Sequence, residues 1–134
     1  MKITVDTNVL VRGVVRDDVT QAKAVDKILK EAALIAVPLA CLCEFVWVLR
    51  RVYSFDQADI AIAIQALLAT GNVVANRAAV EAGLALLEAG GDFADGVIAF
   101  EGAWLGGETF VSFDTKAVTL LSKQGEDTRL LSQL

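Results

Sequence analysis

Apolar and polar residues along the chain predict short strands that alternate with helices. Residues 2–6 ("KITVD"), 72–76 ("NVVAN") and 109–113 ("TFVSF") are short apolar runs with β-branched residues, which is typical of strands. Residues 34–38 ("LIAVP") form either another strand or the exit of the preceding helix. In residues 18–33, apolar side chains recur at helical spacing, so this stretch is predicted to be a helix.

Capping residues and glycines delimit the other predicted helices. Pro38 suits the first turn of a helix, and Ser54 with Gln57 forms an S-x-x-Q capping box. Gly71 suits a helix end, as do the glycine pairs later in the chain. The further helices are predicted over about 38–52, 55–69, 77–89, 95–105 and 115–123. This order predicts an α/β fold with a small parallel sheet of about four to five strands sandwiched by helices.

The length and the apolar content of the chain bear on its assembly. The 134 residues suit one domain, 1–134. Hydrophobic residues make up 55% before glycine is counted, above the usual range of about 45–50% that includes glycine. Part of the apolar surface is therefore predicted to meet another chain, in a homodimer or with a partner protein. We expect Phe45, Trp47 and Phe55 to lie in the core or a dimer contact rather than to stack on bases.

No membrane-spanning segment or signal peptide is predicted. A spanning helix needs roughly 18 or more apolar residues, and the longest apolar stretch is interrupted by Pro38 and Glu44. The apolar run at the N-terminus is too short for a signal peptide. Cys41 and Cys43 lie two residues apart in a predicted helix, cannot easily bridge each other and suit a reducing compartment. We therefore expect a cytoplasmic protein.

The composition excludes several kinds of chemistry. The chain has no histidine and only two cysteines, which excludes zinc sites of the usual type and histidine-dependent catalysis. Its net charge of −5 argues against a protein that simply coats nucleic acid. An enzyme whose carboxylates hold cations remains compatible with that charge.

Glu44 is unexpected within its surroundings. Residues 32–49 are apolar except for Pro38 and Glu44. None of the residues three or four positions away can pair with a carboxylate: Ala40, Cys41, Trp47 and Val48. We expect Glu44 to be buried, where an unpaired carboxylate costs several kcal/mol or loses its charge. Either it is neutral or meets a distant arginine, or it belongs to a functional site.

Three aspartates lie where predicted elements meet. Asp6 and Asp114 stand at the carboxyl ends of predicted strands, where open α/β sheets bind ligands. Asp95, in "GGDFADGVIA", lies where a helix is predicted to begin. Taken singly, each of the three is better explained as a helix N-cap. Asp92 is either an additional acid of a site or a loop cap.

Taken together, the four acids suggest a cation site. Carboxylates gathered in one cavity repel each other and become protonated unless a counter-charge is present. Mg²⁺ and Mn²⁺ prefer oxygen ligands, and a pair of such ions can hydrolyse phosphodiesters without histidine or cysteine. The residues therefore favour a carboxylate-held Mg²⁺ or Mn²⁺ centre.

Four stretches of the sequence resemble the acidic blocks of PIN domain (PilT N-terminus) nucleases. They are "DTNVLVR", "PLACLCEFVWVLRR", "FADGVIA" and "VSFDTKA", and they are most similar to VapC-type toxins of toxin–antitoxin pairs. The resemblance spans nearly the whole chain and places the catalytic, metal-binding acids at Asp6, Glu44, Asp95 and Asp114. Asn8 and Ser112 match supporting polar residues, although the family more often has threonine at the second position.

The resemblance implies a Mg²⁺- or Mn²⁺-dependent endoribonuclease, often acting on structured RNA. It also implies a homodimer and a cognate antitoxin that blocks the site, often with an arginine. Candidate RNA contacts are Arg12, Arg50 and Arg51. The alternatives are an ordinary solvated face for Arg12 and a favourable helix-dipole position for Arg50 and Arg51.

Two other functions are compatible with parts of the pattern. In a non-catalytic interaction module, the acids would be caps and the apolar surface would bind a partner. A phosphorylated receiver-like domain would share the α/β order and a lysine near the end, Lys116. Such domains need an acidic pair directly after the first strand, whereas Asp6 is followed by Thr7 and Asn8, so this alternative is disfavoured.

Overall fold

The computed structural model describes residues 1–132, which form two compact units. The N-terminal unit comprises Met1–Arg77 and the C-terminal unit begins at Ala78. Within the described residues, none of the helices combines the length and apolar character needed to cross a membrane.

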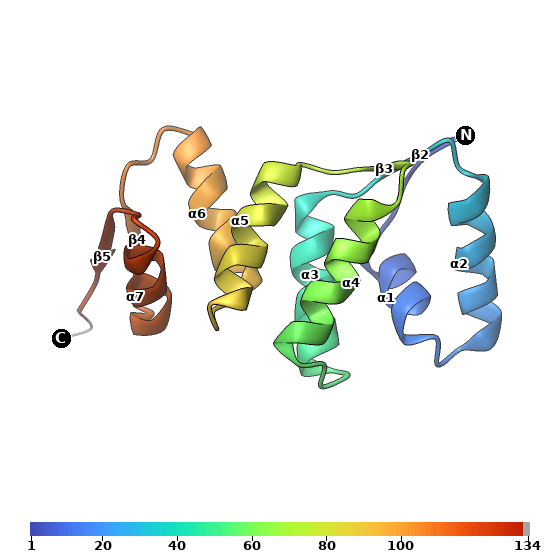
Figure 1. Ribbon diagram of the computed structural model, residues 1–134, viewed down its shortest axis with the longest axis horizontal. Helices are drawn as coiled ribbons and strands as arrows, with labels where there is room; N and C mark the ends of the chain where they lie inside the picture. Colours follow the sequence, from blue (N-terminus) through green and yellow to red (C-terminus); the bar gives the residue numbers. More distant parts are fainter. Residues whose placement is uncertain (133–134) are drawn as a thin grey trace. The chain divides into compact units, whose positions relative to one another are not determined.

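The N-terminal unit contains a three-stranded parallel sheet and four helices (Figure 1). The strands lie in the order β1-β2-β3, with Ile3 opposite Ile35 and Ile35 opposite Val73. Helix α1 packs between α2 and α3. The elements are β1 (Lys2–Thr4), α1 (Thr7–Val15), α2 (Val19–Glu31), β2 (Leu34–Ala36), α3 (Leu39–Arg51), α4 (Gln57–Ala69) and β3 (Val73–Val74).

The C-terminal unit contains a two-stranded parallel sheet, with Val111 opposite Arg129. Helix α7 connects the two strands and packs against both of them (Figure 1). Helix α5 starts at the last residue of the N-terminal unit and continues into the C-terminal one. The elements are α5 (Arg77–Glu88), α6 (Phe93–Trp104), β4 (Phe110–Ser112), α7 (Thr115–Lys123) and β5 (Thr128–Leu130).

The predicted α/β class with parallel strands is confirmed. All four predicted strand regions contain a strand, and 34–38 is resolved as a strand rather than a helix exit. Strand β5 was not predicted, because its three residues include Arg129 and only pairing with β4 identifies it. The described strands form sheets of three and two rather than one continuous sheet.

Two helix starts differ from the predicted ones, and one helix has no predicted counterpart. The capping box at Ser54 is wrong: Ser54 has a left-handed φ of 57°, whereas an N-cap is normally extended. Asp56 caps α4 instead, accepting a hydrogen bond from the Asp59 N–H at 2.8 Å. Helix α6 begins two residues early, at Phe93. Helix α1, directly after Asp6, had not been delimited from the sequence.

Helix α3 determines which side of the apolar stretch is buried. Its buried side chains recur at three- and four-residue spacing, which places them on one stripe of the helix: Cys41, Leu42, Phe45, Val46 and Leu49. Glu44 and Trp47 lie outside this stripe and are exposed, Trp47 by 59%. The expectation that Glu44 is buried is therefore wrong, as is a core position for Trp47.

Glycines bring α5 and α6 of the C-terminal unit into close contact. A Cβ added to Gly96 would lie 2.5 Å from the Ala82 carbonyl oxygen and 2.8 Å from the Gly83 Cα. A Cβ on Gly83 would lie 2.6 Å from the ring of Phe93, which is fully buried. Because these distances are far below van der Waals contact, the packing of α6 on α5 requires the absence of both side chains.

Candidate active site

Two of the predicted acids lie in the N-terminal unit. Asp6 follows β1 and caps α1, accepting a hydrogen bond from the Val9 N–H at 3.3 Å. Glu44 lies on the exposed side of α3. Burial raises the pKa of the Cys41 thiol, and the charges of Asp6 and Glu44 raise it further, while a hydrogen bond with Thr7 opposes them. The structure therefore brings both carboxylates into the neighbourhood of one thiol.

Asp114 in the C-terminal unit has a well-defined orientation. It follows β4 and caps α7, and its Oδ1 accepts hydrogen bonds from the N–H groups of Lys116 (2.9 Å) and Ala117 (3.2 Å). Ser112, one of the predicted supporting residues, accepts a hydrogen bond through Oγ from the Asp114 N–H at 2.9 Å. The serine thereby fixes the turn from which the carboxylate projects.

Asp95 lies in the first turn of α6 and is half-buried. Burial raises its pKa, and the nearby negative charges of Asp92 and Asp114 raise it further. The N-cap of this helix is Asp92, which accepts a hydrogen bond from the Ala94 N–H at 3.2 Å. Asp92 and Asp114 therefore lie close enough to Asp95 to raise its pKa.

The capping explanation accounts for only some of the acids. It fits Asp6, Asp92 and Asp114, each of which accepts a main-chain hydrogen bond at a helix start. It fails for Asp95, because Asp92 holds that position, and it never applied to Glu44 in mid-helix. Each unit therefore contributes one acid that helix capping does not explain.

The available donors suit a hard divalent cation. Carboxylate oxygens are the ligands that Mg²⁺ and Mn²⁺ prefer. In residues 1–132, no group of three or more His, Cys, Asp or Glu side chains is arranged to hold a metal ion. Burial is the main cause of the raised pKa of Asp95, and the negative charges of Asp92 and Asp114 add to it. The residues therefore fit such a cation in the chemistry of their donor atoms.

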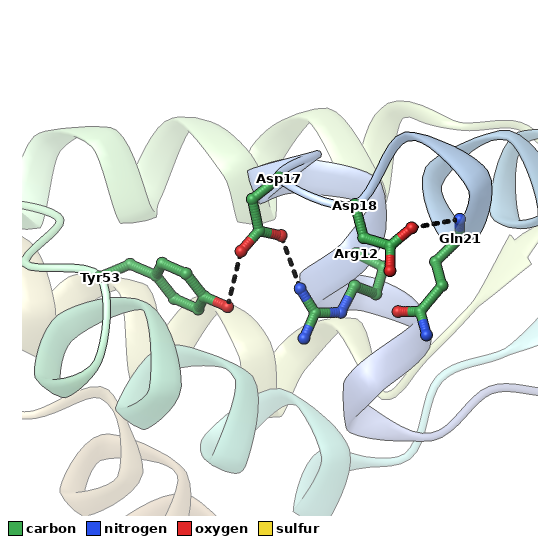
Figure 2. Close-up of polar contacts among 5 residues, drawn as sticks. All are labelled: Arg12, Asp17, Asp18, Gln21 and Tyr53. Atoms are coloured by element: carbon green, nitrogen blue, oxygen red, sulfur yellow. Dashed lines mark hydrogen bonds and ion pairs between the residues drawn. The ribbon is translucent and has the colours of Figure 1, made fainter.

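A polar network that the sequence did not reveal holds one of the candidate RNA contacts. The Arg12 guanidinium donates to Asp17 Oδ1, and the Tyr53 hydroxyl donates to Asp17 Oδ2 at 3.4 Å (Figure 2). The hydrogen bond with Asp17 raises the pKa of Arg12. Because Tyr53 follows α3 and Arg12 lies in α1, this network connects the helix after Asp6 to the helix that bears Glu44.

Other basic residues have different surroundings. Arg16 donates to both carboxylate oxygens of Asp26, at 2.8 and 2.6 Å, and this pairing lowers the pKa of Asp26. Arg50 and Arg51 lie in the last turn of α3 and are exposed. Their position suits the helix dipole. Both explanations therefore remain for these residues: a favourable position at the helix end, and contact with RNA.

Two hollows in the N-terminal unit were not predictable from the sequence. A cavity of about 490 Å³ is lined mainly by apolar side chains, together with Asp26 and Asp59. A second pocket, of about 310 Å³, lies beside Asp6 and has Asn8 and Arg12 among its lining residues. The first is formed by side chains from segments that are distant in the sequence, and the second by the consecutive helices α1 and α2.

The fold and the acids together define a class of protein. An α/β fold whose carboxylates follow parallel strands, in a chain with no histidine, is compatible with hydrolysis by carboxylate-held metal ions. The sequence profile of the PIN domain family matches residues 3–120. The chain therefore belongs to the PIN domain family, a nuclease superfamily whose members generally depend on divalent metal ions. A comparison with curated proteins finds no significant match.

Proposed function

We propose that the protein is a Mg²⁺- or Mn²⁺-dependent endoribonuclease that hydrolyses phosphodiester bonds of RNA. Membership of the PIN domain family supports the nuclease class. The observation that carries the metal dependence is the group of carboxylates in the C-terminal unit. Burial raises the pKa of Asp95, and the negative charges of Asp92 and Asp114 raise it further. A divalent cation would relieve this repulsion.

We assign the cation ligands to Asp6, Glu44, Asp95 and Asp114. When bound, the cation polarises the scissile phosphate and lowers the pKa of water. The cap hydrogen bonds to Asp6 and Asp114 reach Oδ1 in both residues, so both carboxylates would keep acceptor capacity for a cation. Capping thus orients these carboxylates rather than competing with their metal role.

Two polar residues support this arrangement. Ser112 holds the backbone at Asp114 through its hydroxyl, and a threonine would offer the same acceptor. Asn8 lies in the first turn of α1, next to the Asp6 cap, and lines the pocket beside it. We assign both residues to positioning rather than to proton transfer.

We further propose that this nuclease is a cytoplasmic toxin of a type II toxin–antitoxin pair. The cavity of about 490 Å³ supports a protein partner, because it is largely apolar and carries two carboxylates. Apolar side chains of an antitoxin would fill it, and a basic residue would face Asp59, because Asp26 is already paired with Arg16. The exposed apolar residues support a homodimer: Trp47, Val52, Trp104 and Leu105.

Growth and cleavage test this proposal together. We expect expression of the chain alone to stop growth, and expression with the neighbouring gene product to restore it. Purified protein should cleave RNA with Mg²⁺ or Mn²⁺ and lose this activity in EDTA. The metal assignment would be refuted if RNA were cleaved at every metal concentration and if Asp6→Asn cleaved it as well as the wild type.

The exposed apolar residues also suit a non-catalytic module that binds a partner through them. Such a module would bind its partner equally well in EDTA and would not cleave RNA at any metal concentration. The same cleavage titration therefore separates the two functions.

A further inference from the structure

The pocket beside Asp6 combines polar and apolar side chains from α1 and α2. Its volume is about 310 Å³, and it lies wholly within the N-terminal unit. Its lining residues are Asp6, Asn8, Val9, Arg12, Gln21, Ala24 and Val25. Two carboxamides and a guanidinium thus face a hollow that also has an apolar wall.

Hydrogen bonds hold the polar side of this pocket in place. Asp17 binds Arg12 and also accepts from Tyr53, so the guanidinium is anchored (Figure 2). Asp18 caps α2 and accepts a hydrogen bond from the Gln21 N–H at 3.0 Å, which fixes the turn that carries the Gln21 side chain. Groups that are ordered before a ligand arrives bind it at a lower entropic cost.

The polar groups of the pocket can both donate and accept hydrogen bonds. The carboxamides of Asn8 and Gln21 each offer a donor and an acceptor, and the Arg12 guanidinium offers donors only. The pocket is therefore better suited to a ligand with carbonyl or ring-nitrogen groups than to an apolar one.

We infer that this pocket binds one RNA base of the nucleotide next to the cleaved bond and thereby sets a sequence preference. The inference rests on the proposed ribonuclease function, because Asp6 is assigned there to the cation. Carboxamide and guanidinium groups read the edges of bases through directional hydrogen bonds. The apolar wall formed by Val9, Ala24 and Val25 suits the remaining part of a flat base.

A base fits the charges of the pocket better than a phosphate does. The positive charge of Arg12 is already matched by Asp17, and Asp6 adds a negative charge to the lining. A phosphate would therefore meet little net attraction, whereas a neutral base needs donors and acceptors only. Gln21 can act as either, and it is the specificity-determining residue of this inference.

Cleavage of a randomised RNA pool tests the inference. We expect the intact protein to favour particular bases at one position next to the cut. Gln21→Ala should reduce that enrichment about three- to tenfold, the effect of one neutral hydrogen bond. The matched control is Gln65→Ala, which also changes an exposed helical glutamine but lies outside the pocket. Equal enrichment in wild type and Gln21→Ala would overturn the inference.

An arm without catalysis separates this inference from the proposed function. NMR would follow the side-chain amide signals of Asn8 and Gln21 while nucleoside 5′-monophosphates or inorganic phosphate are added to the full chain. We expect the Gln21 signal to shift with some nucleotides and to remain unchanged with phosphate. Equal shifts with phosphate alone, or none with any nucleotide, would overturn the base pocket. If the Gln21 signal shifts with nucleotides but the protein cleaves no RNA, the base pocket stands and the proposed nuclease function is rejected.

Discussion

The two units of the molecule hold their candidate catalytic acids by different means. In the N-terminal unit, side-chain networks connect the helices around Asp6, and Arg12 and Arg16 each pair with an aspartate. In the C-terminal unit, Asp95 lies on α6. There α6 is placed by Gly83 and Gly96, which allow backbone contact with α5. The N-terminal unit thus depends on polar contacts at its surface. The C-terminal unit depends on close helix packing that leaves no room for a larger side chain.

This difference predicts different consequences of mutation. Exposed ion pairs contribute about 0–1 kcal/mol each and weaken with salt, whereas a side chain forced against backbone cannot be relieved by rotation. We therefore expect single substitutions to affect folding most in the C-terminal unit. In the N-terminal unit, substitutions should alter activity more readily than folding.

The largest effect on stability is expected for Gly96→Ala. Its Cβ would meet the Ala82 carbonyl oxygen at 2.5 Å, and α6 would have to move away from α5. We expect a loss of about 3 kcal/mol or more, in the range of severe overpacking. Denaturant unfolding would measure it, and hydrogen exchange should show the loss of protection first in α5 and α6.

Gly102→Ala is the matched control on the same helix. No atom lies within 4 Å of a Cβ built at Gly102, and alanine favours a helix over glycine by about 0.5–1 kcal/mol. This variant should therefore be slightly more stable than the wild type. Equal destabilisation by both variants would show that close packing of α5 and α6 is not what holds this unit.

The largest effect on activity is expected for Asp6→Asn. Asparagine is as good an N-cap as aspartate, so the fold should persist while the charge is lost. We expect RNA cleavage to fall by about a hundredfold or more, since even outer-shell changes at metal sites cost about 10–100-fold. Single-turnover cleavage measures the loss, and a melting temperature close to that of wild type would confirm that the cap is retained.

The pH dependence of stability should distinguish Asp95. Its folded pKa is raised by burial first and by Asp92 and Asp114 next, so the folded state favours the neutral acid. This contribution is complete below the ordinary pKa of 3.8 and is lost as pH rises through the folded pKa. Asp95→Asn should therefore be more stable than wild type at pH 7 but not at pH 3.

Mg²⁺ provides the control for Asp95. A bound cation favours the ionised carboxylate, so added Mg²⁺ should raise the melting temperature of wild type and not that of Asp95→Asn. If Asp95→Asn were less stable than the wild type at pH 7, the assigned cause of the raised pKa of Asp95 would be contradicted.

The smallest effect, of opposite sign, is expected for Asp26→Asn in the N-terminal unit. Its hydrogen bonds with Arg16 lower the folded pKa of Asp26 below 3.8. Stability from the ion pair is thus present above that value and lost as pH falls through the folded pKa. Asp26→Asn should melt slightly below wild type at pH 7 in low salt, with the gap closing in acid.

Glu31→Gln is the control for the ion pair. It removes an exposed acid from the same helix, and the described residues show no ion pair for Glu31. Its melting temperature should follow that of wild type at both pH values and in high salt. A gap of the same size in both variants would attribute the effect to net charge rather than to the pair with Arg16.

Local pattern by itself determined most of the elements and the positions of two acids. The strand regions and the α/β order follow from short apolar runs between helical repeats, because these periodicities act over a few residues. Asp6 and Asp114 were correctly placed directly after strands, since a strand and a helix start are both visible locally. The ordered acidic blocks also sufficed to predict the PIN domain family.

Tertiary structure decided everything that depends on which surfaces meet. Helix α3 is apolar on nearly every side, so its periodicity could not show that Glu44 and Trp47 would be exposed. The cap of α6 at Asp92 rather than Asp95 follows from the position of Phe93, which is packed against Gly83. The pocket of Arg12 and Gln21 likewise exists only because two helices pack together, and no local pattern encodes such a juxtaposition.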